Sequence, residues 1–421
     1  MKRTEFVAFL GVASLLLVLI AGCGGGGGGN GGGGTTGTAI TATITGAVFV
    51  AFQDGRTGAW QRLPSSGSGN YSFNVQAADG RYSVAWVCGG TKPQVNIVHL
   101  TTAEATAFAA SCPSTSTSTV TVSGTVQGLG SGQAALVSAG SASATVGANG
   151  GTFDLSLVPG PYDLIGIRLG TTGEPDKVWL RRSVSFSNNT SGLTIDFTQP
   201  DGTVVRVIDV SSGSLTVTGA DSTETVTTQL YFQSSRRSSL LAVGVPGMPM
   251  QYPIFPAGVL QTGENFRIVV TTDTGRGEVH GLNTLPSSLS ITLPPLFVSP
   301  SFDFSTTGEL TFTAQWGTYS ESPVRAYEFT LSSDVQQRSW RIWISAGWLG
   351  GNNQYTTPVL NTLSGWNSSA WDLQRGSPVN ASFQVLVSPN TVQQLLDYRR
   401  DNIAPDGFRL RFATRSVTLT P

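Results

Sequence analysis

The sequence has little of what metal binding and nucleic-acid binding require. Its 421 residues include three cysteines and two histidines, only 12% are charged, and the formal net charge is −1. So few Cys and His argue against a structural zinc module or an iron–sulfur protein. A net charge near zero argues against the basic field of a nucleic-acid-binding protein. We therefore expect no metal, no cofactor and no nucleic-acid partner.

Catalytic motifs are also lacking. The sequence contains no Gly-x-Ser-x-Gly elbow, no His-Glu-x-x-His and no phosphate-binding loop. The residues left for acid–base chemistry are two histidines and two carboxylate pairs: His99, His280, Glu321 with Glu328, and Asp397 with Asp401. The histidines are explained more simply as polar residues of a strand or turn. Asp397 and Asp401, next to Arg399 and Arg400, are explained more simply as a solvent-exposed charge cluster. The sequence predicts a protein that is not an enzyme.

The N-terminus has the order of a secretory signal peptide over residues 1–22. Two basic residues precede an apolar stretch over residues 6–20, and small residues follow. The run Ile20-Ala-Gly-Cys23 resembles the lipobox of bacterial lipoproteins, with Ile where Leu is usual. The resemblance implies cleavage before Cys23 and acylation of its thiol. The alternative is an uncleaved membrane helix, for which the stretch is at the short limit.

A glycine-rich stretch follows Cys23. Residues 24–34 are all Gly except Asn30, so they can bury nothing, and we expect residues 23–37 to be a lipid anchor and flexible tether. Lipoproteins retained at an inner membrane commonly carry Asp where this chain has Gly24. We therefore expect contact with the membrane through Cys23, at an outer membrane or cell surface.

Strand signals dominate from residue 38 onward. Apolar and polar residues alternate, or apolar runs occur, over residues 40–45, 47–52, 71–75, 82–87, 120–126, 266–270 and 288–293. Asp-Gly and Asn-Gly turns separate them. This pattern predicts an all-β chain of tandem antiparallel β-sandwich modules, immunoglobulin- or transthyretin-like. Ser/Thr-rich and Pro/Gly-rich breaks divide it into modules over residues 38–113, 118–200, 203–298 and 299–421.

Two short helices are expected. Thr101 to Ala110 opens with a capping box, Thr101 to Glu104. Residues 389–401 have apolar residues at helical spacing, with Asn390 or Ser388 as the expected N-cap.

The first two modules share a repeated pattern. Residues 69–75 form an alternating strand followed by a Gly turn and a second strand from Tyr82, and residues 151–157 are followed in the same way by Tyr162. This pattern resembles the carboxypeptidase regulatory-like (transthyretin-like) β-sandwich family. The resemblance covers residues 38–200 and implies a hairpin in each module and a non-catalytic spacer or binding role. No family is recognised for residues 203–421.

Two cysteines remain after Cys23. Export to an oxidising compartment predicts a disulfide between Cys88 and Cys112. The alternative, a pair of redox-active free thiols, is disfavoured because no Cys-x-x-Cys is present and neither cysteine has a basic neighbour.

The last module is rich in tryptophan. Strand alternation over residues 339–345 places Trp340, Ile342 and Ile344 on one face and Arg341 and Trp343 on the other. Loop aromatics beside Asn and Ser are typical of glycan and peptide surfaces. The candidate ligand-binding residues are therefore Trp343, Trp348, Trp366, Trp371 and Arg341. The favoured interpretation is that these tryptophans belong to a core, because large aromatic residues usually do. The alternative is an exposed binding surface, for which Trp343 and Trp348 are the best candidates.

Three arginines, Arg409, Arg411 and Arg415, share one face of the final predicted strand. A solvated sheet edge that discourages aggregation explains them. The alternative is a site for an anionic polymer bearing phosphate or uronate.

Together these features predict an exported, lipid-anchored protein of the cell envelope. Its expected role is non-catalytic binding or adhesion, with an envelope polysaccharide or envelope protein as partner of the Trp-rich module. The alternative is a structural spacer or assembly component, and an envelope hydrolase is least favoured.

Overall fold

The computed structural model describes residues 37–64, 67–113, 118–148, 150–298 and 300–421, which belong to one compact unit. The predictions for residues 1–36, including Cys23, lie outside the described residues. Almost all regular structure in the described part is β-strand, so the predicted all-β sandwich class is confirmed. None of its helices has both the length and the apolar character needed to cross a membrane.

A three-stranded sheet with one topology occurs three times along the chain. In each copy the first strand lies in the middle, antiparallel to one neighbour and parallel to the last strand. In spatial order the three sheets are β4 (Asn70–Val75), β1 (Thr38–Thr45) and β7 (Ala107–Ser111); β11 (Gly151–Leu157), β8 (Val120–Gln127) and β14 (Thr190–Asp196); and β19 (Met250–Ile254), β16 (Ser211–Thr218) and β22 (Ser288–Thr292).

Each copy also supplies a row of four strands to a second sheet. In spatial order these rows are β3 (Trp60–Arg62), β2 (Ala47–Asp54), β5 (Arg81–Cys88) and β6 (Gln94–Thr101); β10 (Ala142–Val146), β9 (Ala134–Ala139), β12 (Gly160–Leu169) and β13 (Pro175–Phe186), extended by β15 (Val205–Asp209); and β18 (Ser239–Val243), β17 (Val226–Gln233), β20 (Asn265–Thr272) and β21 (Gly277–Leu282). Two facing sheets of three and four strands are the composition of an immunoglobulin-type sandwich.

The C-terminal part is a variation on this plan. Its row of four is β26 (Arg338–Ser345), β25 (Val324–Ser333), β28 (Val379–Val387) and β29 (Arg409–Leu419). Its three-stranded sheet is β23 (Ser301–Phe304), β24 (Phe312–Gln315) and β27 (Gln354–Thr356), all antiparallel. Three short helices complete it: α1 (Ala346–Leu349), α2 (Ser368–Trp371) and α3 (Val392–Asp401).

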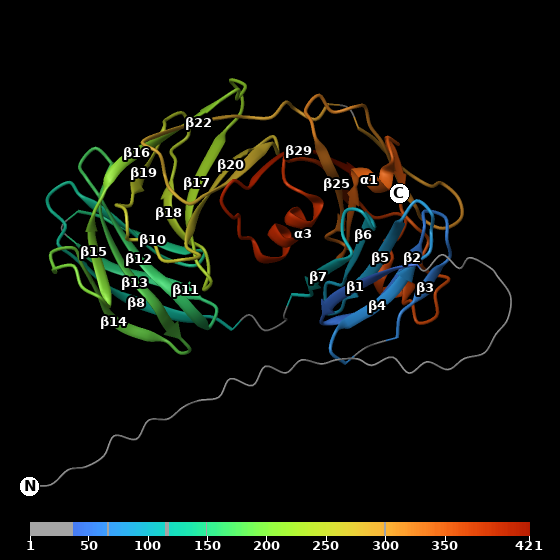
Figure 1. Ribbon diagram of the computed structural model, residues 1–421, viewed down its shortest axis with the longest axis horizontal. Helices are drawn as coiled ribbons and strands as arrows, with labels where there is room; N and C mark the ends of the chain where they lie inside the picture. Colours follow the sequence, from blue (N-terminus) through green and yellow to red (C-terminus); the bar gives the residue numbers. More distant parts are fainter. Residues whose placement is uncertain (1–36, 65–66, 114–117, 149, 299) are drawn as a thin grey trace, which may run out of the picture. The chain divides into compact units, whose positions relative to one another are not determined.

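Three of the four-stranded rows join edge to edge (Figure 1). β21 pairs antiparallel with β29, and β26 pairs parallel with β6, which gives a twelve-stranded sheet within the described residues. The C-terminal row therefore lies between the row from residues 47–101 and the row from residues 226–282. Sheets and cores continue across the module boundaries expected from composition, and those boundaries remain a prediction.

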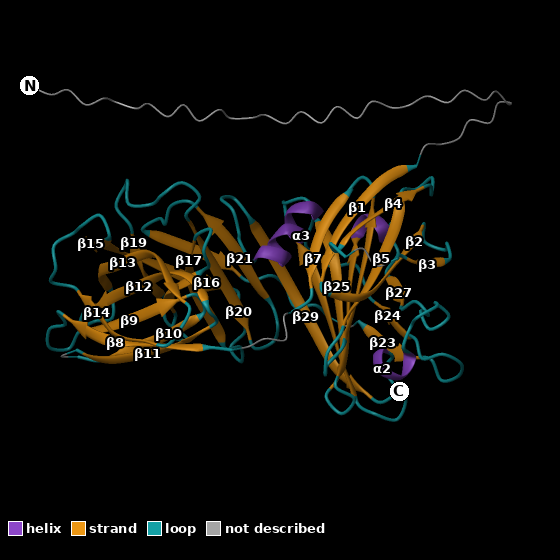
Figure 2. Cartoon of the chain, turned by 90° about the horizontal axis from the view of Figure 1, so that it is seen from below, coloured by secondary structure: helices purple, strands orange, loops and turns teal. Residues whose placement is uncertain are grey.

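The twelve-stranded sheet is covered on both faces where the first and last modules meet. One core, beneath β23, β24 and β27, contains Trp340, Ile342 and Ile344 of β26. The other, beneath β4, β1, β7 and α3, contains Trp343 of the same strand. Figure 2 shows α3 next to β7 and β29. The predicted division of this strand into two faces is thus confirmed.

The predicted strands are all present, but the predicted hairpins are wrong. Residues 71–75 lie in β4 and residues 82–87 in β5, and these strands belong to different sheets. β11 and β12 are separated in the same way in the second module. The Gly turn in each repeat therefore carries the chain from one sheet of the sandwich to the other.

The helix predicted from Thr101 to Ala110 is wrong. The carboxylate of Glu104 does accept a hydrogen bond from the backbone N–H of Thr101, as in a capping box, at 3.0 Å. It also accepts hydrogen bonds from Ser345 Oγ and from the N–H of Gly347. The chain makes one turn and then enters β7, because pairing with β1 satisfies its backbone.

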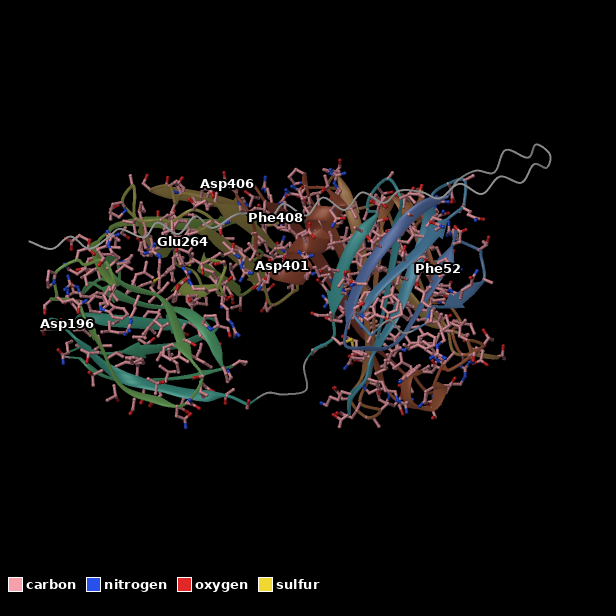
Figure 3. The ribbon with its side chains drawn as sticks, turned by 60° about the horizontal axis from the view of Figure 1, so that its bottom comes forward. Phe52, Asp196, Glu264, Asp401, Asp406 and Phe408 are labelled. Atoms are coloured by element: carbon pink, nitrogen blue, oxygen red, sulfur yellow. A yellow bond between two sulfur atoms is a disulfide. The ribbon has the colours of Figure 1, made fainter. Side chains whose placement is uncertain are left out.

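The second helix is present as α3, with a different cap. Thr391 is the N-cap and forms a capping box with Gln394. Asn390 and Ser388, the expected caps, instead bond the backbone of Arg409 on β29. Beyond the helix, whose last residue Asp401 is labelled in Figure 3 with Phe408, the chain returns to the sheet.

Candidate functional site

Two of the candidate tryptophans are buried. Trp343 is 2% exposed and Trp348 is 5% exposed, so the favoured core interpretation is confirmed for both, and their choice as the best candidates for exposure is wrong. Trp343 lies on the face of β26 that α3 and β7 cover. Trp348 belongs to α1, and its ring lies 4.4 Å from the ring of His99.

The two loop tryptophans fold back against the core. Trp366 and Trp371 are half-buried, and their ring centroids are 5.1 Å apart. The indole N–H of Trp366 donates to the Asp372 carboxylate, and Trp340 donates to the backbone carbonyl of Trp371. Their part in ligand binding stays a prediction.

His99 is a buried structural residue. Its Nδ1 lies 2.7 Å from Ser83 Oγ and its Nε2 lies 2.8 Å from the hydroxyl of Tyr355. Burial, helped by the positive charge of Arg56, lowers the pKa of His99 to about 3. The imidazole is therefore neutral at pH 7, is 2% exposed and links the first module to the last.

His280 lies in a charged joint between β21 and β29. Glu278 and His280 face Arg411 and Arg409 across this antiparallel pair. Glu278 is fully buried and forms ion pairs with both arginines. Burial raises the pKa of Glu278, but hydrogen bonds from His280 and Arg409 outweigh it and leave the pKa below its usual value. Two of the three strand arginines thus join modules; Arg415 is exposed, beyond the part of β29 that pairs with β21.

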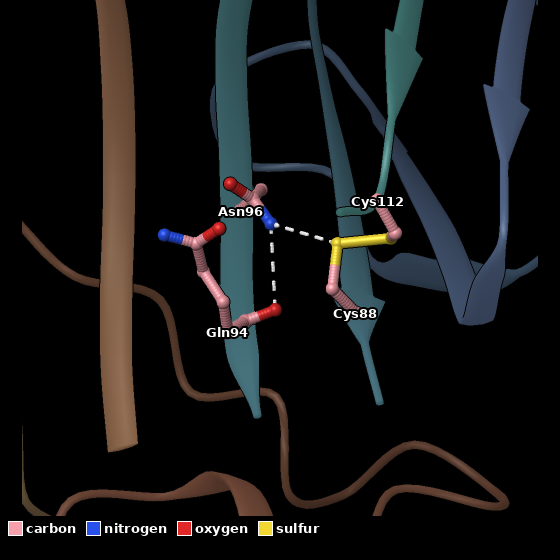
Figure 4. The surroundings of a disulfide bond; sticks show 4 residues. All are labelled: Cys88, Gln94, Asn96 and Cys112. Atoms are coloured by element: carbon pink, nitrogen blue, oxygen red, sulfur yellow. Dashed lines mark hydrogen bonds between the residues drawn. A yellow bond between two sulfur atoms is a disulfide. The ribbon is translucent and has the colours of Figure 1, made fainter. Parts of the chain in front are cut away.

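The predicted disulfide between Cys88 and Cys112 is confirmed (Figure 4). It connects the last residue of β5 to the residue that follows β7. The side-chain amide of Asn96 donates to Cys88 Sγ at 3.6 Å and to the backbone carbonyl of Gln94 at 3.4 Å. The disulfide therefore fixes the end of β7 beside the polar residues of β6.

The groove next to this disulfide, which we call the β7–α3 groove, is the best candidate for a binding site. It has a volume of about 190 Å³. Strands β5, β6 and β26 form its floor, and β7 and α3 form its walls. Its lining includes a half-buried indole, two side-chain amides and three guanidinium groups: Trp86, Gln94, Asn96, Arg341, Arg399 and Arg400.

Positive charge in the groove is only partly matched. Arg341 and Arg399 share one carboxylate, that of Glu328: Arg341 Nε donates to it, and Arg399 Nη2 lies 3.5 Å from it. Arg400, at the rim, already pairs with Asp397 and Asp401. Burial lowers the pKa of Arg399 to about 10; Glu328 raises this pKa and Arg341 lowers it. The guanidinium group of Arg399 makes no hydrogen bond within the described residues, so it can donate hydrogen bonds to a ligand.

Other hollows lack this combination. A hollow of about 300 Å³ is lined by Arg409 and Arg411, but both already pair with carboxylates. Another of about 470 Å³ is lined by Glu104 and Arg325, whose charged groups are hydrogen-bonded within the protein. A third, of about 600 Å³ over residues 301–315, has no basic residue among its described lining residues.

Sequence reasoning found one residue of the β7–α3 groove, Arg341, and missed the others. Trp86 on β5 is directly opposite Asn96 on β6, and Arg341 on β26 is opposite Asn96 on its other side. These three strands carry ordinary alternating sequences, and nothing in them shows which strands pair. The only local signal was Trp86 itself, a large aromatic residue within an alternating strand.

No protein-family model matches the chain, and no match was found among curated proteins. Among solved structures, a "Ca2+-stabilized adhesin" that "helps an Antarctic bacterium reach out and bind ice" is 11% identical, with 92% of this chain and 99% of that chain covered and a TM-score of 0.16. The Bacillus anthracis TIE protein is 10% identical (61% and 50% covered, TM-score 0.15). The chicken CNTN1 FN1-FN3 domains are 9% identical (70% and 96% covered, TM-score 0.18). At TM-scores this low, no function follows from these likenesses.

Proposed function

We propose that this chain is an exported, lipid-anchored, non-catalytic protein of the cell envelope that binds an envelope ligand in the β7–α3 groove. The observation that carries the proposal is the arrangement of Arg341 and Arg399 around a single carboxylate, beside an accessible indole. Binding sites often lie where two modules meet and combine apolar lining with a few polar groups. The groove has both properties, because β5, β6 and β7 come from the first module and β26 and α3 from the last.

Export and anchoring rest on the sequence. The signal-like residues 1–22, the lipobox ending at Cys23 and the glycine tether support them, and the disulfide fits an oxidising compartment. Metabolic labelling with an alkyne fatty acid, followed by membrane fractionation, tests the anchor. The unaltered chain should be labelled and sediment with membranes, whereas Cys23→Ser should lose both properties. Labelling of Cys23→Ser at the same level would contradict the anchor.

Binding in the groove is tested on a soluble chain from residue 35, because residues 37–421 form a compact unit of their own. We expect it to bind isolated cell envelopes, and Arg399→Gln to weaken this binding. Arg415→Gln is the matched control, because Arg415 is exposed and is not among the residues that line the groove. Equal binding by Arg399→Gln and Arg415→Gln would contradict the proposed site.

A second candidate function is a structural spacer, favoured by the continuous sheet that joins three modules. In that case envelope proteins would contact the modules without using the groove. Envelope association that persists in Arg399→Gln and is lost only when Cys23 is replaced would favour the spacer.

A further inference from the structure

We infer that the ligand of the β7–α3 groove is an acidic sugar, that is, a sugar ring bearing a carboxylate. The inference rests on the proposed function, since it names the ligand class of the same site. Three features of the groove carry it: the charge of its arginines and Glu328, the aromatic and amide groups beside them, and the position of α3 beside β7.

The charge favours a single carboxylate. Arg341 and Arg399 both pair with Glu328, so this cluster has two cations and one anion. One additional monoanion neutralises this group. A guanidinium group binds a carboxylate through two parallel hydrogen bonds, and Arg399 makes no hydrogen bond within the described residues, its Nη2 lying 3.5 Å from Glu328. A phosphate dianion would place more negative charge beside Glu328 than the two arginines balance.

The uncharged groups favour a sugar ring. Trp86 offers part of an apolar ring face, and Gln94 and Asn96 offer side-chain amides that can both donate to and accept from hydroxyl groups. Asn96 uses its NH₂ group on Cys88 Sγ and the Gln94 carbonyl, which leaves its side-chain oxygen as an acceptor for a hydroxyl. A flat apolar face beside short polar groups suits a ring with C–H on one side and O–H at its edge.

An extended peptide fits less well. β7 is an outer strand of its three-stranded sheet, and an added strand would need its free backbone edge. α3 contacts β7 and lies beside it in Figure 2, and Leu396 and Arg399 of α3 line the groove. Because α3 lies beside β7, an added strand cannot pair along its edge, and a peptide would bind through its side chains alone.

The experiment is isothermal titration of the soluble chain with defined probes. Tetramers of galacturonate, glucuronate and mannuronate are compared with their uncharged methyl esters, with poly-glutamate and with inorganic phosphate. We expect at least one uronate tetramer to bind and its methyl ester to bind at least about tenfold more weakly. Arg399→Gln should weaken uronate binding at least about tenfold, Arg399→Lys should retain part of it, and Arg415→Gln should change it less than about twofold. Circular dichroism and thermal unfolding confirm that each variant is folded.

Several results would overturn the inference. The first is a methyl ester that binds as tightly as its acid. The second is poly-glutamate or phosphate that binds more tightly than every uronate tetramer. The third is that no uronate tetramer binds. If no uronate binds but envelope binding still depends on Arg399, the acidic-sugar inference fails and the proposed function stands. If envelope binding does not depend on Arg399, both fail.

Discussion

Glu278 on β21 and Arg411 on β29 face each other directly where the sheet of the third module meets that of the last, with 3.0 Å between the carboxylate and the guanidinium. Glu278 is fully buried, and Arg409 binds the same carboxylate. The joint is therefore held by charge as well as by backbone pairing.

Replacing this carboxylate should loosen the joint. Glu278→Gln removes the partner of two arginines, and breaking a buried ion pair on one side costs about 3 kcal/mol of unfolding free energy. Chemical denaturation of the soluble chain measures the change. Arg415→Gln, on the same strand but without this pairing, should cost less than about 0.5 kcal/mol. A Glu278→Gln variant as stable as the control would contradict the assigned role.

Stability should fall in mild acid because of His99. Its pKa is about 3 in the folded chain and about 6.5 when unfolded, so the unfolded state binds more protons between these values. The contribution of neutral His99 to the free energy of unfolding is fully present above pH 6.5 and is lost as the pH falls toward 3. From pH 7 to pH 5 we expect a loss of about 2 kcal/mol from this residue.

Urea denaturation at pH 7 and pH 5 tests this, with His99→Gln as the comparison. The variant is expected to be less stable at pH 7 but to lose less stability on acidification. The same slope in both chains would show that His99 is not the titrating group.

Removing the disulfide should affect both stability and binding. Cys88 and Cys112 are 24 residues apart, and a bond closing such a loop stabilises a protein by about 3 kcal/mol in the chain-entropy model. Cys88→Ala with Cys112→Ala should lower the melting temperature and weaken ligand binding, because the end of β7 is no longer fixed. Binding unaffected by the double replacement would show that the wall of the groove is rigid without the bond.

Tryptophan fluorescence should separate two classes. Five of the nine tryptophans are buried: Trp179, Trp316, Trp340, Trp343 and Trp348. The other four, including Trp86, are half-buried. Iodide should therefore quench only part of the emission. Trp86→Phe should reduce the intensity that iodide quenches and any change on ligand binding, whereas Trp348→Phe should change neither. An opposite result would place Trp348, and not Trp86, at the surface.

The local part of this architecture could be predicted from sequence. Period-two alternation identified the strands, and in β26 it also assigned Trp340 and Trp343 to opposite faces. Alternation is a property of each strand by itself, so it carries no information on partners. The pairing of β26 with β6 joins residues more than two hundred positions apart, and it could not be predicted from either segment.

The errors have physical causes of the same kind. The glycines and asparagines that follow Trp348 made it a candidate for exposure, but its ring packs against His99 of the first module, 4.4 Å away. The capping pattern at Thr101 is satisfied locally by Glu104, yet β1 offers the next residues a strand partner. In both segments a contact made at long range in the sequence outweighs the local preference.

The two edge-to-edge joints also determine when the protein can finish folding. β6 and β21 each end their own row of four strands, and they are covered by β26 and β29, which are synthesised after them. Until β26 and β29 have been made and have paired, two strand edges with unpaired backbone groups stay open to other chains. A chain cut short before residue 299 would keep those edges permanently, so we expect it to aggregate. The C-terminal module therefore also protects its earlier neighbours from self-association during folding.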